Sequence, residues 1–159
     1  MALIGRVNKM KNPAWDRYLR ESDLKDAAIA ICIDKNERFL VIRRSNIDKR
    51  AGQWTIPGGH VDSEDASIEA AAARELEEET GIVASAQNML YLGEPKPGKY
   101  YFLAKSWSGK VDVLIPNPET GLIEHDDWKW ASIEEIKDLA NSEIPIYLLE
   151  KALEMSKNV

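Results

Sequence analysis

Residues 74–82 read Arg-Glu-Leu-Glu-Glu-Glu-Thr-Gly-Ile, a dense run of charge that ends at a glycine. The alanine, leucine and glutamate residues of 67–80 predict a helix, and Gly81 predicts its end. The glutamates therefore crowd a helix C-terminus, where the backbone dipole favours Lys or Arg. Like charges three or four residues apart also destabilise a helix by about 0.2–0.5 kcal/mol per pair. Such a costly arrangement indicates a site for a divalent cation.

Two faces of this predicted helix differ in character. Apolar residues at positions 68, 72 and 76 follow the helical repeat and are expected to face the core. Glu75, Glu78 and Glu79 lie on another face. Because carboxylate oxygens suit hard cations, the set favours Mg²⁺ or Mn²⁺ over Zn²⁺.

The net charge of −6 is concentrated in one segment, since residues 62–81 hold eight acidic residues and one basic residue. The remainder is close to neutral, which disfavours an extended nucleic acid as a partner. No apolar run approaches the roughly 20 residues of a membrane span, and the first 20 residues do not resemble a signal peptide. Cys32 is the only cysteine and lies in an apolar stretch. We therefore expect a cytoplasmic protein with a buried, inert thiol.

The order of predicted elements indicates a mixed α/β domain. Ala27–Ile33 and 38–44 are expected to form a hairpin across a polar turn at 34–37, and 53–56 a short extended piece that 57–59 ends. Further strands are expected over 89–92, 100–107, 110–115 and 128–131. Helices are expected over 67–80, over 133–140 behind a Ser132–Glu135 capping box, and from Pro145 to about Met155.

Residues 1–26 precede this domain, which we place at 27–159. They include a predicted short helix over 13–25 that begins at Pro13. We expect this N-terminal extension to pack on the core. The extension could also pack against a partner protein, so a homodimer is possible.

The segment from Gly59 to Ile82 resembles the signature of the Nudix hydrolases. The family pattern is a glycine, a spacer, and then Arg-Glu-apolar-x-Glu-Glu-x-Gly-apolar, whose second half residues 74–82 match at every defined position. Residues 54–59, Trp-Thr-Ile-Pro-Gly-Gly, look like the family's usual lead-in. The resemblance implies an α/β/α sandwich with a mixed sheet.

The resemblance also implies roles for the residues that match. Glu75, Glu78 and Glu79 would bind Mg²⁺, helped by the carbonyl of Gly59, with Mn²⁺ as a possible substitute. The expected catalytic set is Glu78, Glu75 and Arg74, with Arg74 as an orienting partner. The implied reaction is hydrolysis of a nucleoside diphosphate linked to another moiety.

The spacer departs from the family pattern, because the span from Gly59 to Arg74 is one residue longer here. The first glutamate of the signature, which supports the arginine, falls on Asp65 when counted from Gly59 and on Ala66 when counted back from Arg74. Asp65 or Glu64 could take this role through a bulged loop.

Candidate substrate-binding residues lie outside the signature. Lysine and arginine side chains could touch phosphates, although they could equally be surface residues, and a tryptophan could stack on a base or pack in the core. Glu124 is a candidate extra metal ligand or general base, or part of a solvated acidic loop. The candidates are Arg43, Arg44, Trp54, Lys96, Lys99 and Glu124.

The sequence thus predicts a Mg²⁺-dependent hydrolase of a small nucleotide substrate, with nucleotide sugars, ADP-ribose and (deoxy)nucleoside triphosphates all open. The alternative is a catalytically silent Nudix-like domain that binds a nucleotide as a sensor. The intact set of Glu75, Glu78 and Glu79 favours the enzyme, because a sensor does not need three costly carboxylates.

Overall fold

The computed structural model describes residues 25–141 and 143–158. The extension at 1–26, except for its last two residues, lies outside the described residues, as does nearly all of the helix predicted over 13–25. The elements are β1 (Ala27–Ile31), β2 (Phe39–Arg44), β3 (Trp54–Thr55), β4 (Gly58–His60), α4 (Ile68–Thr80), η1 (Ala86–Asn88), β5 (Met89–Lys96), β6 (Lys99–Ala104), β7 (His125–Ala131), α5 (Ile133–Asp138) and α6 (Ile146–Ser156).

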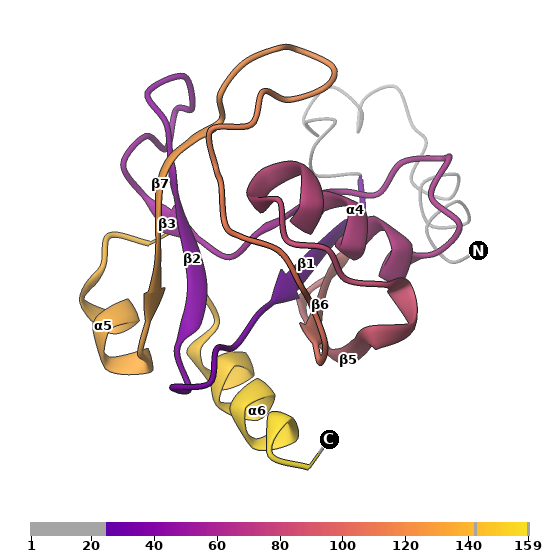
Figure 1. Cartoon of the computed structure of the whole chain (residues 1–159), viewed down its shortest axis with the longest axis vertical. Coiled ribbons are helices and arrows are strands. Elements are labelled where there is room, and N and C mark those ends of the chain that lie inside the picture. Colours follow the sequence, from indigo (N-terminus) through magenta and orange to yellow (C-terminus); the bar gives the residue numbers. More distant parts are fainter. Residues whose placement is uncertain (1–24, 142, 159) are drawn as a thin grey trace, which may run out of the picture.

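The strands form two sheets. The larger has the order β4-β1-β6-β5, in which β1 and β6 run parallel while the other neighbours are antiparallel. The smaller has the antiparallel order β3-β2-β7 and stands beside it in Figure 1. The expected α/β class with a mixed sheet is therefore confirmed.

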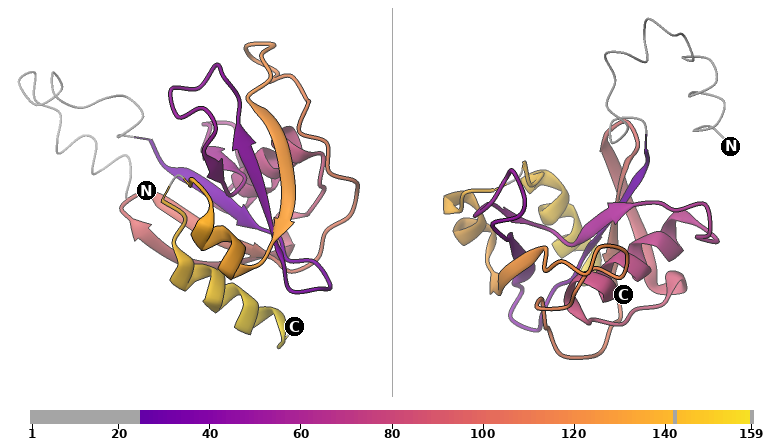
Figure 2. Two further views of the ribbon diagram at one scale, coloured as in Figure 1. Left: turned by 90° about the vertical axis from the view of Figure 1, so that its left-hand side faces the viewer. Right: turned by 90° about the horizontal axis from the view of Figure 1, so that it is seen from above.

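Both faces of β1 are covered, because its side chains alternate between two cores. Ala28 and Ala30 belong to a cluster with Ala72 and Leu76 of α4. The opposite face contributes Ile31 to a second cluster, which includes residues of β2, β5 and α6. The sheet thus lies between α4 and α6, as the views of Figure 2 show, and the fold is an α/β/α sandwich.

The helix α4 has the ends that the sequence predicts. The Ser67 hydroxyl accepts a hydrogen bond from the Ala70 N–H at 3.0 Å. Gly81 adopts a left-handed conformation with φ of 77°, and its N–H donates to the Glu77 carbonyl. No basic residue lies in the last turn, so the glutamates there are left without the cations that a helix C-terminus favours. None of the described helices has the length and apolar content needed to cross a membrane.

The predicted hairpin of 27–33 and 38–44 is wrong as a strand pairing. The chain does turn at 34–37, where the Asp34 N–H donates to the Arg38 carbonyl at 2.9 Å. Beyond a bridge between Ile33 and Phe39, however, β1 and β2 separate and join different sheets. The turn residues specify the reversal, but the pairing of each strand is decided by its neighbours in the sheets.

Two further predictions need correction. Residues 110–115 form no strand; Val113 and Ile115 instead line a pocket, and the Asp112 N–H donates to the Thr80 carbonyl at the end of α4. The Gly58-Gly59 pair does not end a strand but lies in β4. A Cβ atom at Gly58 would lie 2.7 Å from the Ala28 carbonyl, so glycine allows this close pairing with β1.

Candidate active site

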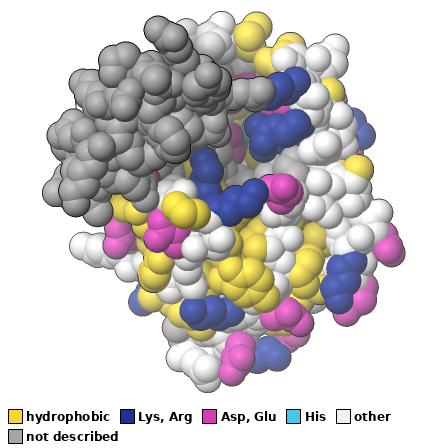
Figure 3. Space-filling model, turned by 180° about the vertical axis from the view of Figure 1, so that it is seen from behind, with side chains coloured by type: hydrophobic (Ala, Val, Ile, Leu, Met, Phe, Trp, Pro, Cys, Tyr) yellow, Lys and Arg dark blue, Asp and Glu magenta, His cyan; other side chains and the backbone are white. Residues whose placement is uncertain are grey.

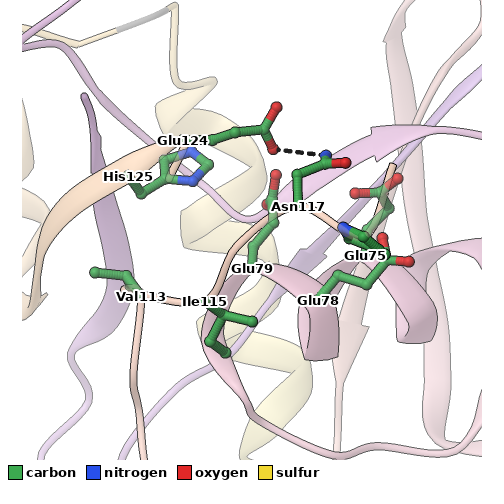
Figure 4. Close-up of a pocket in the computed structure, with 9 residues that line it drawn as sticks. Glu75, Glu78, Glu79, Val113, Ile115, Asn117, Glu124 and His125 are labelled. Atoms are coloured by element: carbon green, nitrogen blue, oxygen red, sulfur yellow. Dashed lines mark hydrogen bonds between the residues drawn. The ribbon is translucent and has the colours of Figure 1, made fainter. Parts of the chain in front are cut away.

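The three glutamates of α4 form one wall of a pocket. The other wall comes from the segment that precedes β7 and from the start of β7, and Figure 4 shows Glu79 pointing toward Glu124. The lining residues are Glu75, Glu78, Glu79, Val113, Ile115, Asn117, Pro118, Glu124 and His125. Acidic side chains from two distant parts of the sequence therefore meet at this point.

The two glycines of β4 bring backbone directly against these carboxylates. The Gly58 N–H donates to Glu79 Oε1 at 2.9 Å. A Cβ atom at Gly59 would lie 2.5 Å from the carboxylate carbon of Glu75 and from one of its oxygens. Any side chain at Gly59 would therefore fill the space that the Glu75 carboxylate occupies.

Burial makes the negative charges in this pocket costly. It raises the pKa of Glu75 to about 7, with Arg74 opposing the shift and Glu78 adding to it. Burial also raises the pKa of Glu79 well above its usual value, and the nearby charge of Glu75 adds to that shift. Both carboxylates are thus in an environment that favours neutralisation by a proton or a cation.

The three glutamates of α4 fit a hard divalent cation in their chemistry, because they offer only oxygen ligands at a site where negative charge is costly. Within residues 25–141 and 143–158, however, no three acidic, His or Cys side chains converge as a ready-made metal-binding group. Arg74 Nη1 instead donates to Glu75 Oε1 at 3.1 Å and to Glu78 Oε2 at 3.0 Å. Each of these hydrogen bonds uses one of the two carboxylate oxygens of the glutamate concerned.

Asp65 fixes the position of Arg74. Its two carboxylate oxygens accept from Arg74 Nε and Nη2, each at 2.9 Å, and the hydrogen bond with Arg74 holds the pKa of Asp65 below its usual value. The His60 carbonyl accepts a further bond from Arg74 at 3.0 Å. Of the two candidates left open by the longer spacer, the structure places Asp65, and not the exposed Glu64, against Arg74.

The opposite wall combines the apolar side chains of Val113 and Ile115 with the polar side chains of Asn117, Glu124 and His125. Asn117 donates from its amide to Glu124 Oε1 at 3.2 Å, the bond drawn in Figure 4. His125 is 5% exposed, and burial, followed by the charge of Arg44, lowers its pKa to about 4. His125 is therefore neutral at physiological pH.

The pocket opens into a larger cleft of about 660 Å³, within the usual size range of ligand sites. Figure 3 shows Lys and Arg side chains gathered around a hollow in the surface. The basic residues that line the cleft are Lys25, Arg44, Arg50, Arg74, Lys96 and Lys99. The cleft thus combines an acidic end with basic groups along its walls.

Four of the six substrate-binding candidates from the sequence line this cleft, namely Arg44, Lys96, Lys99 and Glu124. Arg43 and Trp54 are not among the lining residues. Arg43 pairs with Asp126 at 2.7 Å and lies over the Trp54 ring at 5.8 Å, while Trp54 packs against the core. A contact of these two with substrate stays a prediction.

The thiol of Cys32 has the inert character expected of it. The residue is fully buried, and burial raises the pKa of the thiol to about 12.

The sequence offered weak signals for several lining residues. Asn117 lies between two prolines in a segment that was expected to be a plain loop. Tyr101 lies two residues after Lys99 in β6, so strand alternation places both on the face toward the cleft. Glu143 comes from the segment before α6 and gives no motif.

Replacing Asp65 by Asn should destabilise the protein. The change removes a nearly buried carboxylate, 8% exposed, from its paired bonds with Arg74, and hydrogen bonds to charged groups contribute about 1.5–3 kcal/mol each. Urea unfolding of Asp65→Asn measures this loss. Glu64→Gln is the matched control and should stay within about 0.5 kcal/mol of wild type, because Glu64 is exposed. Equal losses in both variants would contradict the assignment.

Glu75 should lower the stability of the metal-free protein as the pH rises from about 4.5 to about 7, while His125, whose pKa burial lowers to about 4, acts in the opposite direction. Over this range the folded state retains a proton on Glu75, because the pKa of Glu75 is raised to about 7. The unfolded state has already released this proton, so the contribution of Glu75 to stability falls as the pH rises. The contribution of Glu75 is about 1–3 kcal/mol. Unfolding in EDTA at several pH values should show that the free energy of unfolding of Glu75→Gln rises relative to that of wild type as the pH increases, because His125 contributes equally to both proteins. Parallel profiles for the two proteins would refute this account.

Comparison with known proteins agrees with this fold. The model of the NUDIX domain matches residues 23–150. An RNA pyrophosphohydrolase of Bartonella tribocorum is 30% identical over 124 residues, which cover 66% of this chain and 70% of the relative. Phosphatase NudJ of Escherichia coli is 32% identical over 120 residues, covering 74% and 75% of the two chains.

A solved structure shares the fold. The NUDIX domain of Shewanella oneidensis NrtR, complexed with ADP ribose, superimposes with a TM-score of 0.63 at 18% identity, and the match covers 95% of this chain and 97% of that domain. Members of this family generally use divalent metal ions, which agrees with the all-oxygen donor set. The family model, the two relatives and the shared fold show that the chain belongs to the Nudix hydrolases.

Proposed function

We propose that this protein is a Mg²⁺-dependent hydrolase of a pyrophosphate bond in a nucleoside diphosphate linked to another moiety. The observation that carries the proposal is the burial of Glu75 and Glu79, with raised pKa values, at the acidic end of a cleft with basic walls. A structural helix gains nothing from these buried charges. A site that must hold a cation next to a phosphate chain requires them.

The charge balance explains why a cation is needed. A pyrophosphate brought to Glu75 and Glu79 meets like charges, and two unit charges about 4 Å apart repel by roughly 4 kcal/mol at an effective dielectric constant of 20. Bound Mg²⁺ supplies polarisation of the phosphoryl oxygens and a water of lowered pKa. Mn²⁺, which also prefers oxygen ligands, is the expected substitute.

The side chains of the protein then divide the remaining work. Glu75, Glu78 and Glu79 hold the cation, with Gly59 beside them. Asp65 keeps Arg74 beside Glu75 and Glu78, where its positive charge offsets part of theirs.

Groups on the facing wall and the floor act on the substrate in this proposal. Glu124, held by Asn117, is placed to accept a proton from the attacking water. Arg44 and Lys99 line the cleft and are placed to bind phosphate oxygens.

The names of the relatives support a substrate that contains a nucleotide, but they do not agree on a single substrate. One carries the name RNA pyrophosphohydrolase, and the NrtR domain was solved with ADP ribose. In both cases a nucleoside is attached to a phosphate anhydride. Nucleotide sugars, ADP-ribose and (deoxy)nucleoside triphosphates are therefore the substrates to screen. A cytoplasmic setting is part of the proposal, since nucleotides are available there and the single thiol is buried.

Glu78→Gln should remove most turnover while leaving the fold intact. Loss of a group that only supports a metal ligand typically costs 10- to 100-fold, so loss of a ligand should cost about 100-fold or more in kcat/KM. The measurement is product release from a panel of nucleoside diphosphate derivatives with Mg²⁺, read by mass spectrometry. Glu77→Gln is the control, because Glu77 is an exposed neighbour on the same helix. Wild-type rates of hydrolysis in Glu78→Gln would contradict the proposal.

The rival function, a silent nucleotide sensor, predicts a different result in the same screen. It requires that nucleotides bind to the wild-type protein while no panel member is hydrolysed with Mg²⁺ or Mn²⁺.

A further inference from the structure

The floor of the cleft is a face of the four-stranded sheet, and the strand register defines its layout. β1 lies between β4 and β6, and residues in register point to the same face of a sheet. Across the three strands, one row consists of Gly58, Ile29 and Tyr101, and the next of His60, Ala27 and Lys99. All six residues line the cleft. The floor therefore runs from the carboxylate end at β4 to Tyr101 and Lys99 at β6.

The length of this floor suits a nucleotide. Gly58 marks the acidic end, since its N–H binds Glu79. Neighbouring strands lie about 4.8 Å apart, so the Tyr101 backbone is about 10 Å from that of Gly58. A phosphate chain held at the glutamates would extend its nucleoside over Ala27 and Ile29 toward Tyr101.

The far end of the cleft combines an aromatic ring and apolar side chains with a few charged groups at its edge. The Tyr101 ring is half-buried beside Ile29 and Pro145, which also line the cleft. Burial raises the pKa of the Tyr101 phenol to about 12, with smaller effects from Tyr147 and Glu143, so the phenol stays neutral. The environment differs from the charged carboxylate end and offers a flat surface for an uncharged ring.

A polar pair closes this end of the cleft. Lys96, from the end of β5, forms an ion pair with Glu143, from the segment before α6. Both residues line the cleft. Glu143 has a φ of 55°, a conformation that only a few per cent of non-glycine residues adopt. The pair offers a cationic donor and a carboxylate acceptor at the edge of the apolar surface.

We propose that Tyr101 is the nucleobase-recognition residue, against whose ring the base of the substrate stacks, with Lys96 and Glu143 at the polar edge of the base. The inference rests on the proposed function and narrows it, because it assigns the β6 end of the cleft to a base and not to a sugar. A base would use both features of this end, because its flat ring fits against Tyr101, Ile29 and Pro145 while its polar edge meets the Lys96–Glu143 pair. A planar base gains by stacking on an aromatic ring.

Calorimetric binding of uncleavable probes tests this assignment. The probes are AMP, GMP and ribose 5-phosphate, each with Mg²⁺, since the last has the phosphate and ribose but no base. The wild-type protein should bind the better of the two nucleotides about 5- to 150-fold more tightly than ribose 5-phosphate, the range expected for one stacked base. Tyr101→Leu should abolish this preference, while Tyr101→Phe should keep it.

Two controls separate recognition from folding. Tyr91→Leu replaces a tyrosine of β5 that is 54% exposed, and it should leave the preference unchanged because Tyr91 does not line the cleft. Thermal melting shows whether Tyr101→Leu is folded. The wild-type protein alone can overturn the inference, if it binds the nucleotides and ribose 5-phosphate with equal affinity. An unchanged preference for the nucleotides in folded Tyr101→Leu would overturn it as well.

The outcomes also distinguish this inference from the proposed function. Tyr101-dependent binding with no hydrolysis of any nucleotide would overturn the hydrolase proposal and keep the base-recognition role. If hydrolysis depends on Glu78 but the preference for nucleotides over ribose 5-phosphate does not depend on Tyr101, the hydrolase proposal stands and the base-recognition role is overturned.

Discussion

The partial burial of the carboxylates at the end of α4, to which their mutual repulsion adds, is the constraint on which the rest of the site depends. Burial raises the pKa of both Glu75 and Glu79; the charge of Glu75 adds to the shift at Glu79, and the charge of Glu78 adds to the shift at Glu75. The neighbouring structure compensates only in part. Arg74 neutralises Glu75 and Glu78 and is itself held by Asp65, and the Gly58 N–H serves Glu79. The remaining deficit of positive charge is what a divalent cation would supply.

The divergence of β1 and β2 gives this charge a place to act. Because the two strands join different sheets, a cleft opens with β1, β4 and β6 as its floor and with residues of β2 and β3 on its other side. The absence of a Cβ atom at Gly58 and Gly59 of β4 lets the backbone lie against β1 and the Glu75 carboxylate. One fold feature therefore produces both the acidic end and the long floor that leads to Tyr101.

The sequence predicted best what depends on local chemistry. The ends of α4 and the capping box of α5 follow from the hydrogen bonds of single side chains, and the signature identified the glutamates. Sequence reasoning was wrong or incomplete where contacts between residues distant in the sequence determine the structure. The separation of β1 from β2 and the extended 110–115 segment depend on partners elsewhere in the fold, and the choice of Asp65 over Glu64 depends on the loop path. Asn117 and Tyr101 reach the site only through the tertiary structure.

The most direct test of the central claim is the free energy of unfolding as a function of Mg²⁺ concentration, for the wild-type protein and for the double variant Glu75→Gln/Glu79→Gln. A cation that binds only the folded state stabilises it by about 2.7 kcal/mol at 100 times its Kd. The account predicts that wild type gains stability with Mg²⁺, whereas the variant is more stable than wild type in EDTA and gains nothing from the metal. A wild-type protein that is indifferent to Mg²⁺, or a variant that gains as much as wild type, would contradict it.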